Sequence, residues 1–175
     1  QKVHFSEASE GMVSPTELAA MLINQGQTFE EGIAIAQESI KGSCSLLVLT
    51  EKGLYAARDR LGRTPVVIGR KSGAWAASSE SCAFFNLDYE VEKFLGPGEI
   101  VVLTADGYQQ RKKPNDRMQI CSFLWVYYGY PASSYEGINV EAVRYRCGSA
   151  LARNDDVAPD FVSGIPDSGI GHAIG

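Results

Sequence analysis

The residues Pro166, Asp167, Ser168 and Gly169 combine side-chain oxygen atoms with turn-forming geometry near the end of the sequence. They follow the apolar run FVSGI and precede small residues that can begin a helix. Backbone amides at the start of a helix bind anions, and Asp167 and Ser168 add oxygen ligands. Two interpretations therefore stay open from the residues alone: an anion-binding loop, or a surface turn, since these are also common turn residues.

The cysteines and histidines offer little further chemistry by their spacing. No two cysteines form a CxxC pair, and a chain of this length needs no disulfide framework. We expect reduced thiols and no zinc site within the chain, because neither His4 nor His172 has the spacing of a zinc ligand. We assign no role to either histidine. The cysteines are Cys44, Cys82, Cys121 and Cys147.

The composition excludes several classes of protein. Hydrophobic residues make up 45% of the 175 residues, which indicates a globular chain. The net charge of −5 argues against a nucleic-acid-binding surface. We see no run of about 18–20 apolar residues that would span a bilayer and no secretory signal in QKVHFSEASEGM. We therefore expect a cytoplasmic protein, and the missing initiator Met suggests a start further upstream.

Two helices and a set of short strands are predicted before residue 112. Ser14 and Thr28 are the expected N-caps, each with a glutamate three residues later. Apolar runs separated by tight turns then predict antiparallel strands, among them a type I turn from Asp59 to Gly62 and a hairpin around Asp106-Gly107. We expect the two helices to cover this sheet.

The pattern changes after the charged, proline-containing segment KKPNDRM, residues 112–118. A helix is predicted over INVEAVRYRCGSALAR, and FVSGI is predicted to be a buried strand that leads into the PDSG loop. Strand, loop and helix in this order indicate a βα unit of a parallel sheet. The aromatic run between Phe123 and Tyr130 is expected in the core and at a domain interface. The predicted fold class is thus α+β followed by α/β.

Five motifs together resemble the amidophosphoribosyltransferase family, the glutamine phosphoribosylpyrophosphate amidotransferases of purine biosynthesis. They are, in order, ARDRLGRTPVVIG, SSESCAF, LGPGEIVVLTADG, ICSFLWVYYGYPASSYEGINVE and GIPDSGIGHAIG. The ARDxxGRxP pattern alone is less specific, because glucosamine-6-phosphate synthase and asparagine synthetase carry relatives of it. The other motifs narrow the match to the purine enzyme, and the resemblance is weakest over residues 1–13.

The resemblance implies a domain layout and an activity. Residues 1–115 would be part of a type 2 glutamine amidotransferase domain with the N-terminal-nucleophile αββα fold. Residues 116–175 would begin a type I phosphoribosyltransferase domain with a parallel sheet. The parent would make 5-phosphoribosylamine, pyrophosphate and glutamate from phosphoribosylpyrophosphate, glutamine and water, and would be a homo-oligomer. Ammonia could replace glutamine as nitrogen donor.

The family's catalytic groups are not expected in this sequence. Its nucleophile is an N-terminal cysteine, and its acidic substrate motif lies further downstream. We therefore predict no catalytic residue here, an internal fragment of the enzyme, and no activity for the chain alone. Two alternatives stay open: another class II glutamine amidotransferase such as glucosamine-6-phosphate synthase, and a non-catalytic nucleotide-binding homologue.

The resemblance also assigns site residues. Asp167, Ser168 and Gly169 would lie beside the substrate pyrophosphate, and Ser168 would help to hold Mg²⁺, which prefers oxygen ligands. Cys121 stands where one branch of the family ligates a [4Fe–4S] cluster, whose other ligands would come from downstream; a small buried residue in a strand is the other interpretation.

Two further positions bear on glutamine binding. Pro15 replaces an aspartate that binds the α-amino group of glutamine in many members, so the parent is expected to use ammonia better than glutamine. The turn that contains Arg58, Asp59 and Arg63 is interpreted as structural, with Asp59 capping it and the arginines pairing with nearby acids.

Overall fold

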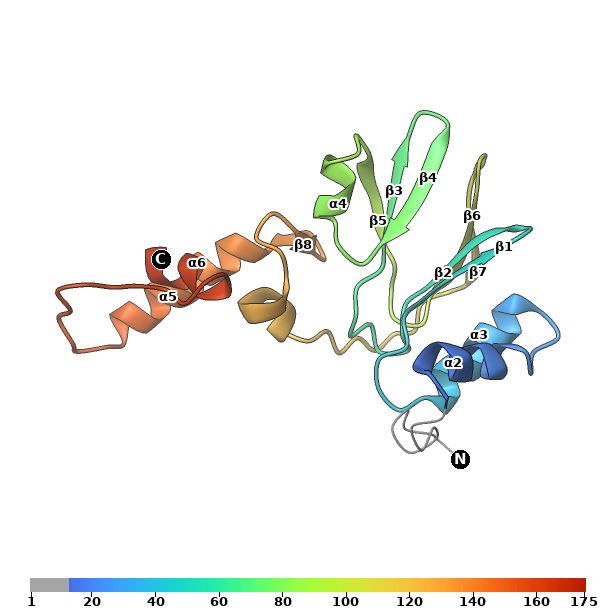
Figure 1. Ribbon diagram of the computed structural model, residues 1–175, viewed down its shortest axis with the longest axis horizontal. Coiled ribbons are helices and arrows are strands. Elements are labelled where there is room, and N and C mark those ends of the chain that lie inside the picture. Colours follow the sequence, from blue (N-terminus) through green and yellow to red (C-terminus); the bar gives the residue numbers. More distant parts are fainter. Residues whose placement is uncertain (1–12) are drawn as a thin grey trace. The chain divides into compact units, whose positions relative to one another are not determined.

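The computed structural model describes residues 13–175, which form two compact units (Figure 1). Residues 1–12, with His4 and the segment searched for a secretory signal, lie outside the described residues. Of the described chain, the first unit takes the residues up to Ser79 together with Glu90–Ile120. The second unit combines Glu80–Tyr89 with Cys121–Gly175.

Among its described residues, the first unit contains two helices and two antiparallel sheets. The helices are α2 (Pro15–Ile23) and α3 (Phe29–Ser39). One sheet has the strand order β1-β2-β6-β7 and the other β4-β3-β5. The strands are β1 (Leu46–Thr50), β2 (Gly53–Ala57), β3 (Val67–Lys71), β4 (Ala74–Ser78), β5 (Glu90–Phe94), β6 (Ile100–Thr104) and β7 (Gly107–Lys112).

Alternating side chains of the central strands place the four-stranded sheet between two cores. Tyr55 and Ala57 of β2 pack with the helices α2 and α3, whereas Ala56 between them packs with residues of the three-stranded sheet. In β6, Ile100 likewise packs with the two helices, and Val101 packs with residues of the three-stranded sheet. Because successive side chains of a strand point to opposite faces, the layers run helices, sheet, sheet. This explains why IVVL is apolar at every position.

The predicted helix starts are confirmed. Ser14 Oγ accepts from Glu17 N at 3.2 Å, and the Glu17 carboxylate accepts from Ser14 N at 2.8 Å, which completes a capping box. Thr28 Oγ1 accepts from Glu31 N at 3.2 Å. The predicted hairpin around Asp106-Gly107 is also present, with Thr104 paired to Gly107. Strand β5, rich in glutamate and lysine, was missed because it carries a weak apolar pattern.

Most regular elements of the second unit are helices. It contains a short helix α4 (Cys82–Phe85), a π-helix η1 (Leu124–Tyr128), the paired segments β8 (Ser134–Tyr135) and β9 (Ile138–Asn139), and the helices α5 (Val140–Arg153) and α6 (Ser168–Ile174). Asn139 caps the predicted helix α5 by accepting from Ala142 N at 2.9 Å. Within the part of the chain that the structure describes, no helix is long and apolar enough to cross a membrane.

The prediction of a buried strand at FVSGI is wrong. Residues 161–165 are in no strand, and the exposed fractions of Phe161 and Ile165 are 94% and 85%. A strand is stable only when a neighbour pairs its backbone groups, and every pairing among residues 13–175 is antiparallel and lies elsewhere. The apolar composition of FVSGI indicates strand propensity, but it does not show whether a neighbouring strand is present to pair with it.

The prediction of core positions for the aromatic run is wrong for most of its members. Trp125 is buried, but Phe123, Tyr127, Tyr128 and Tyr130 are exposed. The run forms the π-helix rather than an extended segment, so its side chains spread around a helix axis. Only the side facing α5 and β8 is covered, and Trp125 lies there, in an edge-to-face contact with Tyr135 at 5.6 Å.

Candidate functional site

The loop Pro166-Asp167-Ser168-Gly169 lines a pocket of about 480 Å³ in the second unit. Tyr127, Tyr128 and Ile165 complete the lining. The Ser168 side chain is half-buried, and Gly169 N donates to Ile165 O at 2.9 Å, which closes the loop. Asp167 is the N-cap residue of α6, but its carboxylate makes no capping hydrogen bond. The predicted loop therefore presents its oxygen atoms at an aromatic-walled pocket.

The aromatic wall is positioned by a buried arginine on α5. Arg144 is 1% exposed. Its Nε donates to Trp125 O at 3.0 Å, and its Nη2 donates to Tyr127 O at 3.0 Å and to Gly129 O at 2.7 Å. The last carbonyls of a helix lack partners within the helix, so one guanidinium satisfies the end of η1 and fixes Tyr127 and Tyr128.

Helix α6 also contacts the π-helix η1 through a side chain. His172 Nε2 lies 3.0 Å from Val126 O, within hydrogen-bond distance. Helices α5 and α6 cross closely at Gly148, where an added Cβ would lie 1.9 Å from His172 O. Gly175 N donates to Gly171 O, and Ser149 Oγ donates to Gly175 O at 2.7 Å. His172, to which we assigned no role from its spacing, is thus a structural residue that connects helix α6 to the pocket wall.

The SSESCAF motif is tied to the segment before α5. The Glu80 carboxylate accepts from Tyr135 Oη at 2.7 Å and from Ser133 Oγ at 2.5 Å. Ser81 Oγ donates to Ser134 O at 3.1 Å and accepts from Ser134 N at 2.8 Å. Burial, followed by the hydrogen bond to Glu80, raises the pKa of Tyr135 above its ordinary value. The motif therefore organises the second unit, and nothing in its sequence spacing indicated this.

The turn that begins at Arg58 is structural, as predicted. Gly62 N donates to Asp59 O at 2.9 Å, which makes the predicted turn. The buried Asp59 carboxylate accepts from Leu61 N, Thr64 N and Ser43 Oγ at 2.8–3.1 Å. Arg58 donates to the backbone carbonyls of Leu95 and Gly62 at 2.5 and 2.7 Å, which ties the turn to neighbouring backbone.

The remaining predicted residues do not line this pocket. Cys121 is exposed in a loop, which argues against a small buried strand residue at this position. Within residues 13–175, no group of three or more His, Cys, Asp and Glu side chains could hold a metal. Pro15 is exposed at the first turn of α2 in the first unit. Sequence reasoning missed Arg144, and a lone basic residue inside a helix pattern gives no signal of burial.

Solved structures of glutamine phosphoribosylpyrophosphate amidotransferase are similar to this chain over most of its length. The enzyme from Bacillus subtilis in complex with ADP and GMP matches with a TM-score of 0.84 and 31% identity, over 95% of this chain and 38% of that one. A structure described as the allosteric regulatory enzyme of purine biosynthesis matches with a TM-score of 0.83 and 30% identity, over 95% and 37%. The α+β class with antiparallel sheets is thus confirmed.

Curated relatives of the chain carry the name amidophosphoribosyltransferase. The Bacillus subtilis protein is 34% identical over 165 residues, which are 93% of this chain and 35% of the relative. The Archaeoglobus fulgidus protein is 34% identical over 173 residues, 98% of this chain and 37% of the relative. The predicted resemblance is confirmed, and the chain spans little more than a third of the length of these relatives. No family model matches the chain.

Proposed function

We propose that the complete protein is an amidophosphoribosyltransferase of purine biosynthesis. It would convert phosphoribosylpyrophosphate, glutamine and water into 5-phosphoribosylamine, pyrophosphate and glutamate. The observation that carries this proposal is the similarity over 93–98% of the chain to enzymes of this name in a bacterium and an archaeon. The structural likeness supports it independently, because it includes both compact units.

The two units would divide the reaction between them. We assign residues 1–115 to the glutamine amidotransferase domain with the N-terminal-nucleophile fold, supported by the helix-sheet-sheet layering of the first unit. We assign residues 116–175 to the phosphoribosyltransferase domain, in which the PDSG loop lines its pocket. The enzyme would act in the cytoplasm as a homo-oligomer.

The PDSG pocket is the proposed site of the pyrophosphate group. Asp167, Ser168 and Gly169 lie at the start of α6, where loop amides and the Ser168 hydroxyl can contact phosphate oxygens. Ser168 would be one oxygen ligand of Mg²⁺, a metal that accepts neutral oxygen donors and keeps several waters. When bound, Mg²⁺ would neutralise the leaving pyrophosphate.

Steady-state kinetics of the complete enzyme test this site. We expect Ser168→Ala to raise the KM for Mg-phosphoribosylpyrophosphate several-fold, because one neutral ligand contributes about 1 kcal/mol. Ser163→Ala, which removes an exposed hydroxyl outside the loop, is the matched control. Unchanged KM together with a lowered melting temperature in Ser168→Ala would identify Ser168 as a turn residue. Absence of phosphoribosylamine formation by the unmodified complete enzyme, with glutamine and with ammonia, would overturn the proposed function itself.

We also propose Cys121 as one ligand of a [4Fe–4S] cluster. Its exposure leaves the thiol accessible, and the cluster would need three thiolates from outside the described residues. Iron and sulfide analysis of the complete protein, purified without oxygen, tests this. We expect Cys121→Ser to lose the iron and Cys82→Ser to keep it. Equal metal content in Cys121→Ser and the unmodified protein would refute the assignment.

A further inference from the structure

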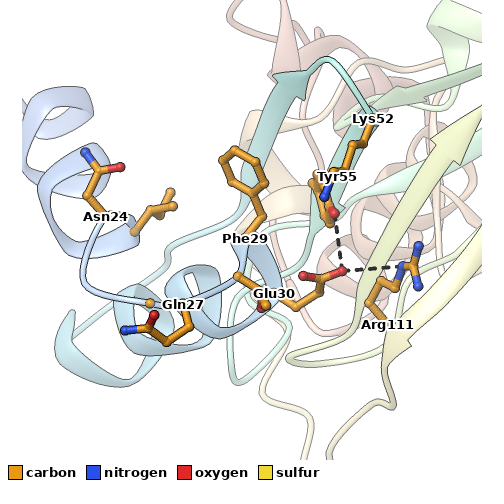
Figure 2. Close-up of a pocket in the computed structure, with 10 residues that line it drawn as sticks. Asn24, Gln27, Phe29, Glu30, Lys52, Tyr55 and Arg111 are labelled. Carbon is orange, nitrogen blue, oxygen red and sulfur yellow. Dashed lines mark hydrogen bonds and ion pairs between the residues drawn. The ribbon is translucent and has the colours of Figure 1, made fainter.

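A second pocket, of about 500 Å³, lies in the first unit between the α2–α3 connection and the edge of the four-stranded sheet (Figure 2). Its charged lining residues are Glu30 on α3, Lys52 in the β1–β2 turn and Arg111 on β7. Tyr55 and Phe29 supply aromatic rings. We propose that this pocket binds a small organic anion, a carboxylate or a phosphate ester carried on a planar ring.

The charge of the pocket favours an anion. Among the described residues that line the pocket, Glu30 is the single carboxylate and Lys52 and Arg111 are the cations, so these residues carry a net charge of +1 within a chain of net charge −5. Figure 2 shows Lys52 and Arg111 on either side of Tyr55. A positive pocket on a negative protein attracts small anions.

The Glu30 carboxylate already contacts Tyr55 and Arg111, which leaves Lys52 and part of the Arg111 guanidinium for a ligand. Its Oε1 accepts from Tyr55 Oη at 3.2 Å and lies 3.5 Å from Arg111 Nε. A hydrogen bond from its own backbone, aided by Thr28, Tyr55 and Arg111, lowers the pKa of the Glu30 carboxyl. Because Arg111 contacts Glu30 through Nε, its two terminal nitrogens remain for a bidentate contact to a carboxylate or phosphate.

The aromatic rings and amides favour a planar body over a bare ion. Phe29 and Tyr55 pack at 5.5 Å between ring centroids, tilted by 38°, and Phe29 keeps 39% of its surface exposed. An exposed ring beside a pocket offers a stacking face for a flat ligand. The side chains of Asn24 and Gln27 also line the pocket and can donate to and accept from polar edges of the ligand.

This pocket shares no residue with the PDSG pocket and lies wholly within the first unit. Its ligand therefore does not depend on the proposed reaction, and either inference can fail without the other.

Titration of the full chain with simple probes, followed by isothermal calorimetry and by amide NMR shifts, tests the proposal. The probes are benzoate, phenyl phosphate, inorganic phosphate and benzylamine. We expect saturable binding of benzoate or phenyl phosphate, with shifts at Phe29, Tyr55 and Arg111. The tighter of these two identifies the anionic group, whereas inorganic phosphate binds more weakly and benzylamine does not bind.

Charge-removing variants locate the site. Lys52→Gln and Arg111→Gln should each weaken binding about fivefold, the scale of a partly exposed ion pair. Lys113→Gln, which removes an exposed positive charge outside the pocket, should change binding less than twofold. Lys52 lies in a turn, so its variant keeps the fold even if Arg111→Gln does not. The proposal is overturned if neither ring-bearing anion saturates, if benzylamine or inorganic phosphate binds as tightly, or if Lys52→Gln behaves like Lys113→Gln.

Discussion

Arg144 Nη2 lies 2.7 Å from the carbonyl oxygen of Gly129, at the point where the π-helix η1 ends. The same guanidinium reaches the carbonyls of Trp125 and Tyr127. A buried side chain on α5 thus replaces the hydrogen bonds that the end of η1 cannot make for itself. Its position fixes the backbone that carries Tyr127 and Tyr128 beside the PDSG loop.

We predict that Arg144→Met strongly destabilises the second unit. The substitution keeps much of the side-chain volume but leaves three carbonyls without their donor, which costs about 3 kcal/mol or more. This corresponds to a fall of roughly 6–12 °C in melting temperature. Trp125 fluorescence in a Trp75→Phe background measures unfolding near the site. Arg153→Met, on the exposed end of the same helix, is the control, and equal melting temperatures for both variants would contradict the prediction.

We predict that Gly148→Ala destabilises the packing of α5 on α6. Alanine is favoured over glycine inside a helix by about 1 kcal/mol, so propensity alone predicts a gain. The new Cβ would lie 1.9 Å from His172 O, however, and overpacking of this kind costs roughly 1–3 kcal/mol. We expect a lower urea midpoint than that of Arg146→Ala, a change on the exposed side of α5. A higher midpoint for Gly148→Ala would show that the helices separate freely.

The thiols should differ sharply in reactivity. Burial, with a smaller contribution from the charge of Asp59, raises the pKa of Cys44 to about 11, whereas Cys121 is exposed. At neutral pH we expect Ellman's reagent to modify Cys121 first and Cys44 only on unfolding. Cys121→Ser should abolish the fast phase. Equal rates at both thiols in the folded protein would contradict this order.

The raised pKa of Cys44 also predicts sensitivity to alkali. The folded state retains the thiol proton above pH 9, where the unfolded chain loses it. The free energy of unfolding should therefore fall as pH rises from 9 towards 11 and be unaffected by this group below pH 9. Urea unfolding at several pH values measures this slope. A Cys44→Ala variant should lose that part of the slope, and an unchanged slope would assign it to other groups.

We predict that Pro15→Asp improves glutamine use by the complete enzyme, an outcome that rests on the proposed function. An aspartate would restore the expected partner of the glutamine amino group, and a charged hydrogen bond of this kind contributes about 1.5–3 kcal/mol, roughly ten- to a hundredfold in kcat/KM. Aspartate is also compatible with the first turn of α2. Activity with ammonia should stay constant. Equal kcat/KM for glutamine before and after the change would show that another residue serves this role.

Local chemistry determined the parts of the structure that the sequence could predict. The caps at Ser14 and Thr28 act over three residues, and the hairpin at Asp106-Gly107 depends on its own turn. The turn at Asp59 likewise forms with its neighbours Leu61 and Thr64. Such interactions involve residues close in the chain, so their spacing alone predicts them. The motifs also established the resemblance to the amidophosphoribosyltransferases, since their order along the chain is specific.

Tertiary structure decided which residues meet across long separations. Glu80 reaches Ser133 and Tyr135, and Arg144 reaches the end of η1, and no local pattern encodes these contacts. FVSGI has strand propensity but forms no strand. A segment of this kind becomes a strand only where another strand supplies hydrogen bonds, which a local pattern cannot predict. The sequence by itself therefore determined the local elements and the family resemblance. The fold alone decided that Ser168 shares a pocket with Tyr127 and Tyr128, because that contact depends on how α5, α6 and η1 pack.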